Sequence, residues 1–176
     1  DEKSGMTIPA TLEGAAPAAA ESSEGYLVYR GALGSRFEGG HLIHRAHEEG
    51  TEDYVSIDVE PAEEQVSYRV SLESKVAGLR LVDNVLEFIA GDGTPLLRMA
   101  RPYVVDLAGT KHEATTSVSG CAYDTDPSES TERAPTPPGA EVCRVTVSWG
   151  DLDAPYPLLL DPGWTTTGSM SMVRKS

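Results

Sequence analysis

The feature that most constrains the fold is a period of two in hydrophobicity, which recurs from Tyr26 onward. In VSYRVSLE (66–73), apolar and polar residues alternate, so an extended chain there has one apolar and one polar face. The segments YVSIDVE (54–60) and CRVTVSW (143–149) alternate in the same way. This pattern predicts half-buried antiparallel β-strands with one face toward water. No stretch of a dozen residues has the 3.6-residue period of an amphipathic helix.

Turn signals separate these runs at short intervals. Asp83-Asn84, Gly91-Asp92-Gly93 and Ala108-Gly109 each follow or precede an apolar segment, and Asp161-Pro162-Gly163 follows the last one. Short strands joined by tight turns are typical of sandwiches and barrels. The sequence therefore predicts an all-β fold, an antiparallel β-sandwich of roughly nine to eleven short strands.

The apolar content predicts where the folded part lies. Residues 1–24 are rich in Ala, Pro, Glu and Ser and have few large apolar side chains, so we expect a flexible leader there. We expect the sandwich to occupy 25–163, and 164–176 to be a linker. Asp161-Pro162-Gly163 is the structural turn that ends the last strand, with Asp161 accepting hydrogen bonds from turn amides.

Charge excludes some classes of partner. The chain has a formal net charge of −14, from 28 acidic and 14 basic residues. Such a surface repels nucleic acid and anionic lipid headgroups. No apolar run reaches the roughly 18 to 20 residues that a transmembrane helix requires, so no membrane-spanning segment is expected.

Cys121 and Cys143 are the two cysteines of the chain, and they flank a polar, Pro-rich segment that is not expected to fold alone. A disulfide between them would fasten this excursion to the sheet at its base. By the loop-entropy argument, such a bridge stabilises the fold by roughly 3 kcal/mol. Two free buried thiols are the alternative. We favour the disulfide, and with it an extracytoplasmic location.

Three histidines, His41, His44 and His47, lie within seven residues. Imidazole is a common zinc and copper ligand, so the cluster raises the possibility of a metal site. On a strand, however, His41 and His47 share a face about 20 Å apart while His44 points to the other side. Surface histidines on a polar strand are therefore the default interpretation, and the metal site is the alternative.

The segment YDTDPSESTE offers three oxygen donors for calcium, Asp124, Asp126 and Glu129. The EF-hand pattern is not met, and an acidic loop is the simpler interpretation. The chain also lacks G-x-S-x-G and H-E-x-x-H. We therefore expect no catalytic residue, and no cofactor unless calcium binds in this loop.

Two motifs resemble a known family. Pro102-Tyr103-Val104-Val105-Asp106 with Gly109, and Tyr156-Pro157 through Asp161-Pro162, resemble parts of a β-rich module that precedes kelch-type repeats in large secreted or lipoprotein-type bacterial proteins. The second motif is similar to the YP-x-x-x-DP end strand of Rhs-like and wall-associated proteins. The terminal TGSMSMVRKS (167–176) resembles the opening of a kelch repeat, which implies a downstream propeller-like domain of the same protein.

Together these observations predict a non-catalytic, extracytoplasmic β-sandwich module of a multidomain bacterial surface or secreted protein. It would act as a spacer, adhesion or recognition element whose partner is a surface protein or a glycan. The alternative is a secreted metal-binding protein or metal-dependent enzyme that uses His41, His44 and His47 or the acidic loop 124–132.

Overall fold

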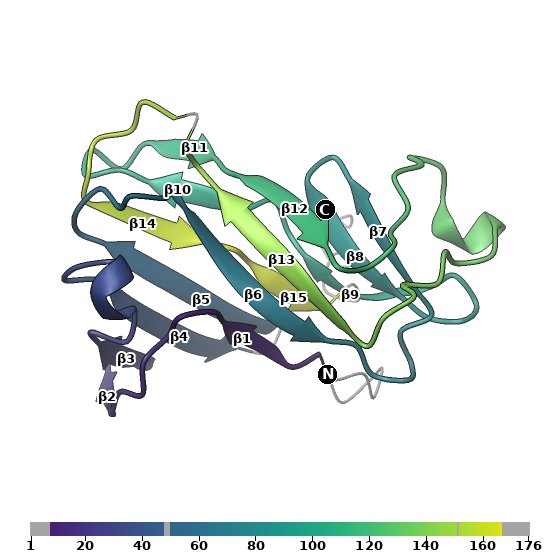
Figure 1. Cartoon of the computed structure of the whole chain (residues 1–176), viewed down its shortest axis with the longest axis horizontal. Helices are drawn as coiled ribbons and strands as arrows, with labels where there is room; N and C mark the ends of the chain where they lie inside the picture. Colours follow the sequence, from purple (N-terminus) through teal and green to yellow (C-terminus); the bar gives the residue numbers. More distant parts are fainter. Residues whose placement is uncertain (1–7, 48–49, 151, 167–176) are drawn as a thin grey trace, which may run out of the picture.

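The chain forms a two-layer, all-β sandwich (Figure 1). This computed structural model describes residues 8–47, 50–150 and 152–166. Every strand pairing in these residues is antiparallel apart from one isolated bridge, so the predicted fold class is confirmed. The strands exceed the expected number, in part because β1 and β2 form within the segment predicted to be a flexible leader. The elements are β1 (Ala10–Leu12), β2 (Ala20–Ser23), β3 (Tyr26–Arg30), η1 (Gly34–Arg36), β4 (His41–His47), β5 (Gly50–Ile57), β6 (Gln65–Ser71), β7 (Gly78–Val82), β8 (Val85–Ile89), β9 (Pro95–Met99), β10 (Tyr103–Val105), β11 (Lys111–Glu113), β12 (Thr115–Ser119), η2 (Ser130–Glu132), β13 (Val142–Ser148), β14 (Leu158–Asp161) and β15 (Trp164–Thr166).

The smaller sheet has the order β1-β6-β13-β12. The register of β6 and β13 places Tyr68 opposite Val145 and Val70 opposite Cys143, so the apolar residues of both strands share the inner face. All four of these residues are buried. The alternation in the sequence therefore predicted the inward face of this sheet correctly.

The larger sheet has the order β11-β10-β14-β5-β15-β9-β8-β7, and β4, β3 and β2 extend it from the other edge of β5. Strands β14 and β15 both pair with β5 and follow each other along it, separated by the turn at 162–163. Their opposite edges pair with β10 and β9. The Ala100 amide donates to the Gly163 carbonyl at 2.8 Å, which continues the pairing across the interruption.

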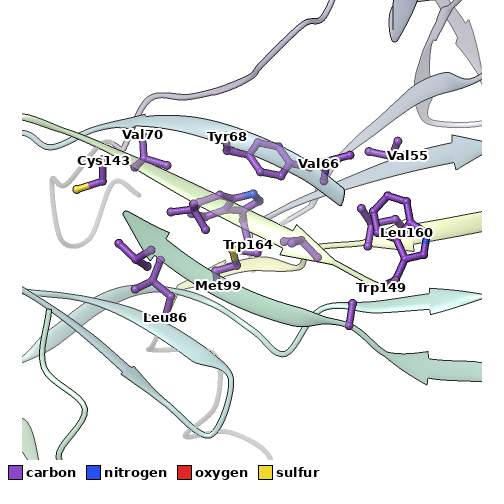
Figure 2. Close-up of a cluster of buried hydrophobic side chains, with 14 of the residues drawn as sticks. Val55, Val66, Tyr68, Val70, Leu86, Met99, Cys143, Trp149, Leu160 and Trp164 are labelled. Atoms are coloured by element: carbon purple, nitrogen blue, oxygen red, sulfur yellow. The ribbon is translucent and has the colours of Figure 1, made fainter. Parts of the chain in front are cut away.

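The core lies between the two sheets (Figure 2). Trp164 of β15 lies near its centre and is 8% exposed. Its ring meets Tyr68 of the smaller sheet edge-on, with 6.3 Å between centroids, and lies 6.1 Å from the Phe88 ring of β8. Large aromatic side chains contribute much of the buried apolar area in such a core.

The N-terminal boundary predicted from composition is wrong. Residues 10–12 form β1 on the edge of the smaller sheet, and residues 20–23 form β2 on the edge of the larger one. The Glu13 amide donates to the Ser67 carbonyl at 2.8 Å, and the Ala16 amide to the Ala32 carbonyl at 2.6 Å. Edge strands are held by backbone hydrogen bonds on one side, so they need few apolar side chains.

The predicted linker at 164–176 is wrong at its start. Residues 164–166 form β15, and Trp164 belongs to the core, because the chain re-enters the sheet directly after the turn. Residues 1–7 and 167–176 lie outside the described residues, and with them the segment that resembles a kelch repeat. Among the described residues, no helix has the length and hydropathy needed to cross a membrane.

Candidate functional site

A disulfide joins Cys121 to Cys143, as predicted. Their Cα atoms are 5.4 Å apart, and the two residues are separated by 22 positions in the sequence. Cys143 lies on β13 and is buried, so the bridge ties the intervening loop to the core at its base. We call residues 121–143 the disulfide-bonded loop. It runs along the end of the sandwich where β7 and β8 lie (Figure 1).

Arg80 of β7 fixes the middle of the disulfide-bonded loop. Its guanidinium donates to the carbonyl oxygens of Asp126, Pro127 and Ser128, at 2.9 to 3.0 Å. Its Nη1 also donates to the Glu87 carboxylate on β8 at 2.6 Å, so the guanidinium is itself held in place. The loop backbone is therefore anchored to the outer face of the larger sheet by a charged, hydrogen-bonded group.

Two acidic residues of this loop, Asp124 and Asp126, are paired with a cation of the chain. Arg133 contacts the carboxylate of Asp124 at 2.6 Å and that of Asp126 at 3.2 Å. Hydrogen bonds from Ser128, with smaller contributions from the charges of Arg133 and Arg80, lower the pKa of Asp126. Glu129 directly precedes η2, and its side chain makes no cap hydrogen bond.

These contacts weigh against the calcium hypothesis. The Arg133 guanidinium contacts both Asp124 and Asp126, so the negative charge of these two carboxylates is already paired with a cation of the chain itself. Within 8–47, 50–150 and 152–166, no group of three or more His, Cys, Asp or Glu residues is arranged to hold a metal ion.

His41 and His44 of β4 also do not converge. His44 pairs through Nδ1 with the carboxylate of Asp53, which lies opposite it on β5. His41 accepts a hydrogen bond from the Gly31 amide at Nδ1, at 3.3 Å, on the other face of the strand. The backbone of His47 belongs to β4, but its side chain lies outside the described part of the chain. The pairing of His44 with Asp53 could not be seen in the sequence, because it depends on the register of β4 and β5.

Asp161 plays the structural part predicted for it. Its Oδ1 accepts a hydrogen bond from the Gly163 amide at 2.9 Å, and its Oδ2 accepts one from the Tyr103 hydroxyl at 2.6 Å. Burial raises the pKa of this carboxyl, against the opposing effect of the two hydrogen bonds. Pro162 is buried and Gly163 has a positive φ of 57°, which completes the turn between β14 and β15. The contribution of Tyr103 was not predicted.

A pocket of about 310 Å³ lies between the two sheets near β1, and sequence reasoning missed it. We call it the inter-sheet pocket. Its walls come from both sheets, and a sequence cannot show which inward-facing residues leave space between them. The lining residues are Ala10, Leu12, Leu27, Tyr29, Leu42, His44, Asp53 and Tyr68.

Comparison with known proteins found no match for this chain among protein-family models, curated proteins or solved structures. The disulfide-bonded loop and the inter-sheet pocket are therefore the features of the molecule that bear on its function.

Proposed function

We propose that this domain is a non-catalytic, extracytoplasmic recognition module of a multidomain bacterial surface or secreted protein. Its binding element is the disulfide-bonded loop, and its partner is a surface protein or a glycan. The observation that carries the proposal is the double fixation of this loop, by the Cys121–Cys143 bridge at its base and by Arg80 along its middle.

A fixed loop has a physical advantage in binding. A polar segment that is already ordered loses less conformational entropy when it meets a partner. Residues 125–129 of the loop are exposed, although their backbone is held by Arg80 and Arg133. Exposed groups on a rigid scaffold are the usual arrangement at recognition sites.

The extracytoplasmic location is supported by the disulfide, because such bonds persist in oxidising compartments and are rare in the bacterial cytosol. The test is a thiol count on protein isolated from its native cells after alkylation under non-reducing, denaturing conditions. We expect no free thiol per chain. Two free thiols would contradict both the native disulfide and the location inferred from it.

The recognition role is tested with a loop chimera. Residues 125–139 are replaced by a Gly/Ser segment of equal length, with both cysteines kept, and the matched control replaces 107–110, another exposed turn. We expect the chimera to lose binding to intact producing cells and to immobilised glycans, and the control to retain it. Equal binding by all three proteins would show that the loop is not the binding element.

A neighbouring propeller-like domain also belongs to this proposal. It is supported by the resemblance of residues 102–109 and 156–162 to modules that precede kelch-type repeats. In that setting the sandwich would also act as a spacer or adhesion element that positions the propeller. Sequencing the gene beyond Ser176 tests this part: repeats with Gly-Gly and aromatic positions are expected, and a stop codon there would contradict it.

A further inference from the structure

We propose that the inter-sheet pocket binds a small amine, a molecule with an apolar body and one cationic amino group. The amino group would be received by the Asp53 carboxylate and the Tyr68 hydroxyl, and the apolar body by the leucines of the pocket. This site is separate from the disulfide-bonded loop, so the inference is independent of the recognition role proposed above.

The pocket is built from inward-facing residues of both layers. On the smaller sheet, the register of β1 and β6 places Leu12 directly opposite Tyr68. On the larger sheet, Leu27 pairs with His44, and His44 pairs with Asp53. Strand β1 lies in front of β4 and β5 (Figure 1), and it is only three residues long, so the layers leave space at this edge.

The Tyr68 hydroxyl is the first sign of a ligand. Tyr68 is 3% exposed, and its Oη has no hydrogen-bond partner among the residues that the structure describes. Buried tyrosine hydroxyls normally have a partner, since leaving one unpaired destabilises the fold. A buried polar atom of this kind therefore calls for an explanation, and a bound molecule would provide one.

Asp53 is the second sign. His44 engages its Oδ1, but a carboxylate has further lone pairs that can accept hydrogen bonds from a ligand. Asp53 and Tyr68 both line the pocket, and the Asp53 charge adds to the effect of burial in raising the pKa of the Tyr68 hydroxyl. Of the residues that the structure describes, no Lys or Arg lines the pocket, and its charged or ionisable lining residues are Asp53 and its partner His44, with Tyr29 and Tyr68 as hydroxyls.

These features select one chemical class. An ammonium group supplies three donors, which Asp53 and the Tyr68 oxygen can both accept. A carboxylate ligand would be repelled by the Asp53 carboxylate and by the net charge of −14. A purely apolar ligand would leave the Tyr68 hydroxyl without a hydrogen-bond partner. Leu12, Leu27 and Leu42 offer an apolar wall, and about 310 Å³ is at the small end of ligand pockets.

The test is a titration of the ¹⁵N-labelled chain with three probes of one shape, followed by NMR. The probes are 2-phenylethylamine, the neutral 2-phenylethanol and the anionic 3-phenylpropanoate. We expect saturable shifts for the amine at the amides of β1, β4 and β6, with an affinity at least about tenfold above that of the alcohol. The anion should not bind. Equal binding of amine and alcohol, shifts confined to other strands, or no binding at millimolar amine would overturn the proposal.

Two variants locate the polar contacts. Asp53→Asn and Tyr68→Phe should each weaken binding of 2-phenylethylamine at least about fivefold. The exposed Asp153→Asn and the outer-face Tyr26→Phe are matched controls and should bind as the unmodified chain does.

Tyr68→Phe keeps the proposal testable even if Asp53→Asn fails to fold. Asp53→Asn disturbs the pair with His44, whereas Tyr68→Phe removes a hydroxyl that has no partner within the described residues, so its melting temperature should not fall. If folded Tyr68→Phe binds the amine with unchanged affinity, the Tyr68 hydroxyl does not contact the amine and the proposal is wrong.

Discussion

Asp161 is buried, and its carboxylate is held by the Tyr103 hydroxyl and the Gly163 amide. Asp161→Ala leaves both donors without their partner, so we expect the free energy of unfolding to fall by about 2 to 3 kcal/mol. Urea denaturation at pH 7 measures this. The exposed Asp153→Ala is the control and should change stability little, and an equal loss in both variants would contradict the role of Asp161.

Burial also gives Asp161 a distinctive pH dependence. Because its pKa is raised in the fold above the ordinary 3.8, the folded state binds the proton more tightly than the unfolded state. The contribution of this group to stability is therefore greatest below pH 3.8 and declines as the pH rises through the folded pKa. Relative to Asp161→Asn, which cannot ionise, the unmodified chain should lose stability over this window. A stability difference that is constant or increases with pH would contradict the inference.

A chain of two hydrogen bonds closes the loop before β14. The buried Trp149 donates from Nε1 to the Tyr156 hydroxyl at 2.9 Å, and Tyr156 donates to Glu64 at 2.8 Å. Tyr156→Phe leaves the Trp149 N–H and the Glu64 carboxylate without this partner. We expect a loss of about 1 to 2 kcal/mol in urea denaturation. Tyr26→Phe, which keeps its ring under Arg45, is the control expected to have little effect.

Single residues also show how far alternation predicts burial. Val66 and Val70 point inward as expected, but Ser67, expected on the wet face, is 7% exposed. Its hydroxyl pairs with that of Thr146 on the neighbouring strand at 2.9 Å, a contact set by register. Val59 continues the apolar phase of the sequence but is 54% exposed, because β5 ends at Ile57. Periodicity predicts the face of a residue, whereas its burial depends on where the strand stops and what lies across it.

Among the elements, the disulfide-bonded loop depends on its covalent closure. Replacing both cysteines by alanine should lower the free energy of unfolding by roughly 3 kcal/mol, because the unfolded chain gains freedom. Urea denaturation of the double variant and of the reduced unmodified chain should give similar midpoints, since both lack the bridge. No change in either sample would show that the loop is held without its disulfide.

The charged anchor of this loop can be tested separately. The Glu87 side chain lies between Arg80 and Arg98, at 2.6 and 2.7 Å, and is mostly buried. Arg80→Gln removes the donors to the loop carbonyls and one partner of Glu87, so we expect amide hydrogen exchange at 124–133 to accelerate and stability to fall by about 2 to 4 kcal/mol. Arg69→Gln on the exposed face of β6 is the matched control. Unchanged exchange in the loop would contradict the anchoring role.

The elements that the sequence did not predict share a physical cause. The strands at 10–12 and 20–23 have little apolar content of their own and become strands through pairing with β6 and β3. The path of the disulfide-bonded loop is fixed by Arg80, which lies far from it in the sequence. Such contacts follow from tertiary structure, which local composition does not encode.

For the whole molecule, the added N-terminal strands predict a limit on truncation. A chain that begins at residue 25 lacks β1, which covers one edge of β6, and β2, which covers one edge of β3. We expect its melting temperature to fall by at least about 5 °C relative to a chain that begins at residue 8. Equal melting temperatures in a thermal scan would support the boundary predicted from composition instead.

The strand order also explains why the fold class was predictable and the sheet topology was not. Turn signals and alternation predict neighbours such as β7 and β8, which are joined by Asp83-Asn84 and pair directly. They cannot predict that β5 pairs with β14 and β15, which lie about a hundred residues later. The inter-sheet pocket depends on the pairing of β1 with β6 and on the packing of one sheet against the other, so neither its walls nor its polar groups could be predicted from local patterns.

The position of β14 and β15 has a consequence for biosynthesis. They come last among the described strands, yet they lie in the interior of the larger sheet, between β5 on one side and β10 and β9 on the other. While the polypeptide is being translated, three parts of this sheet, β2–β5, β7–β9 and β10–β11, have no strand pairing with one another among the described residues. They can be joined only after residues 158–166 leave the ribosome exit tunnel. Until then the facing edges of β5, β9 and β10 stay open, and a nascent chain in that state is a natural client for chaperones that shield such edges.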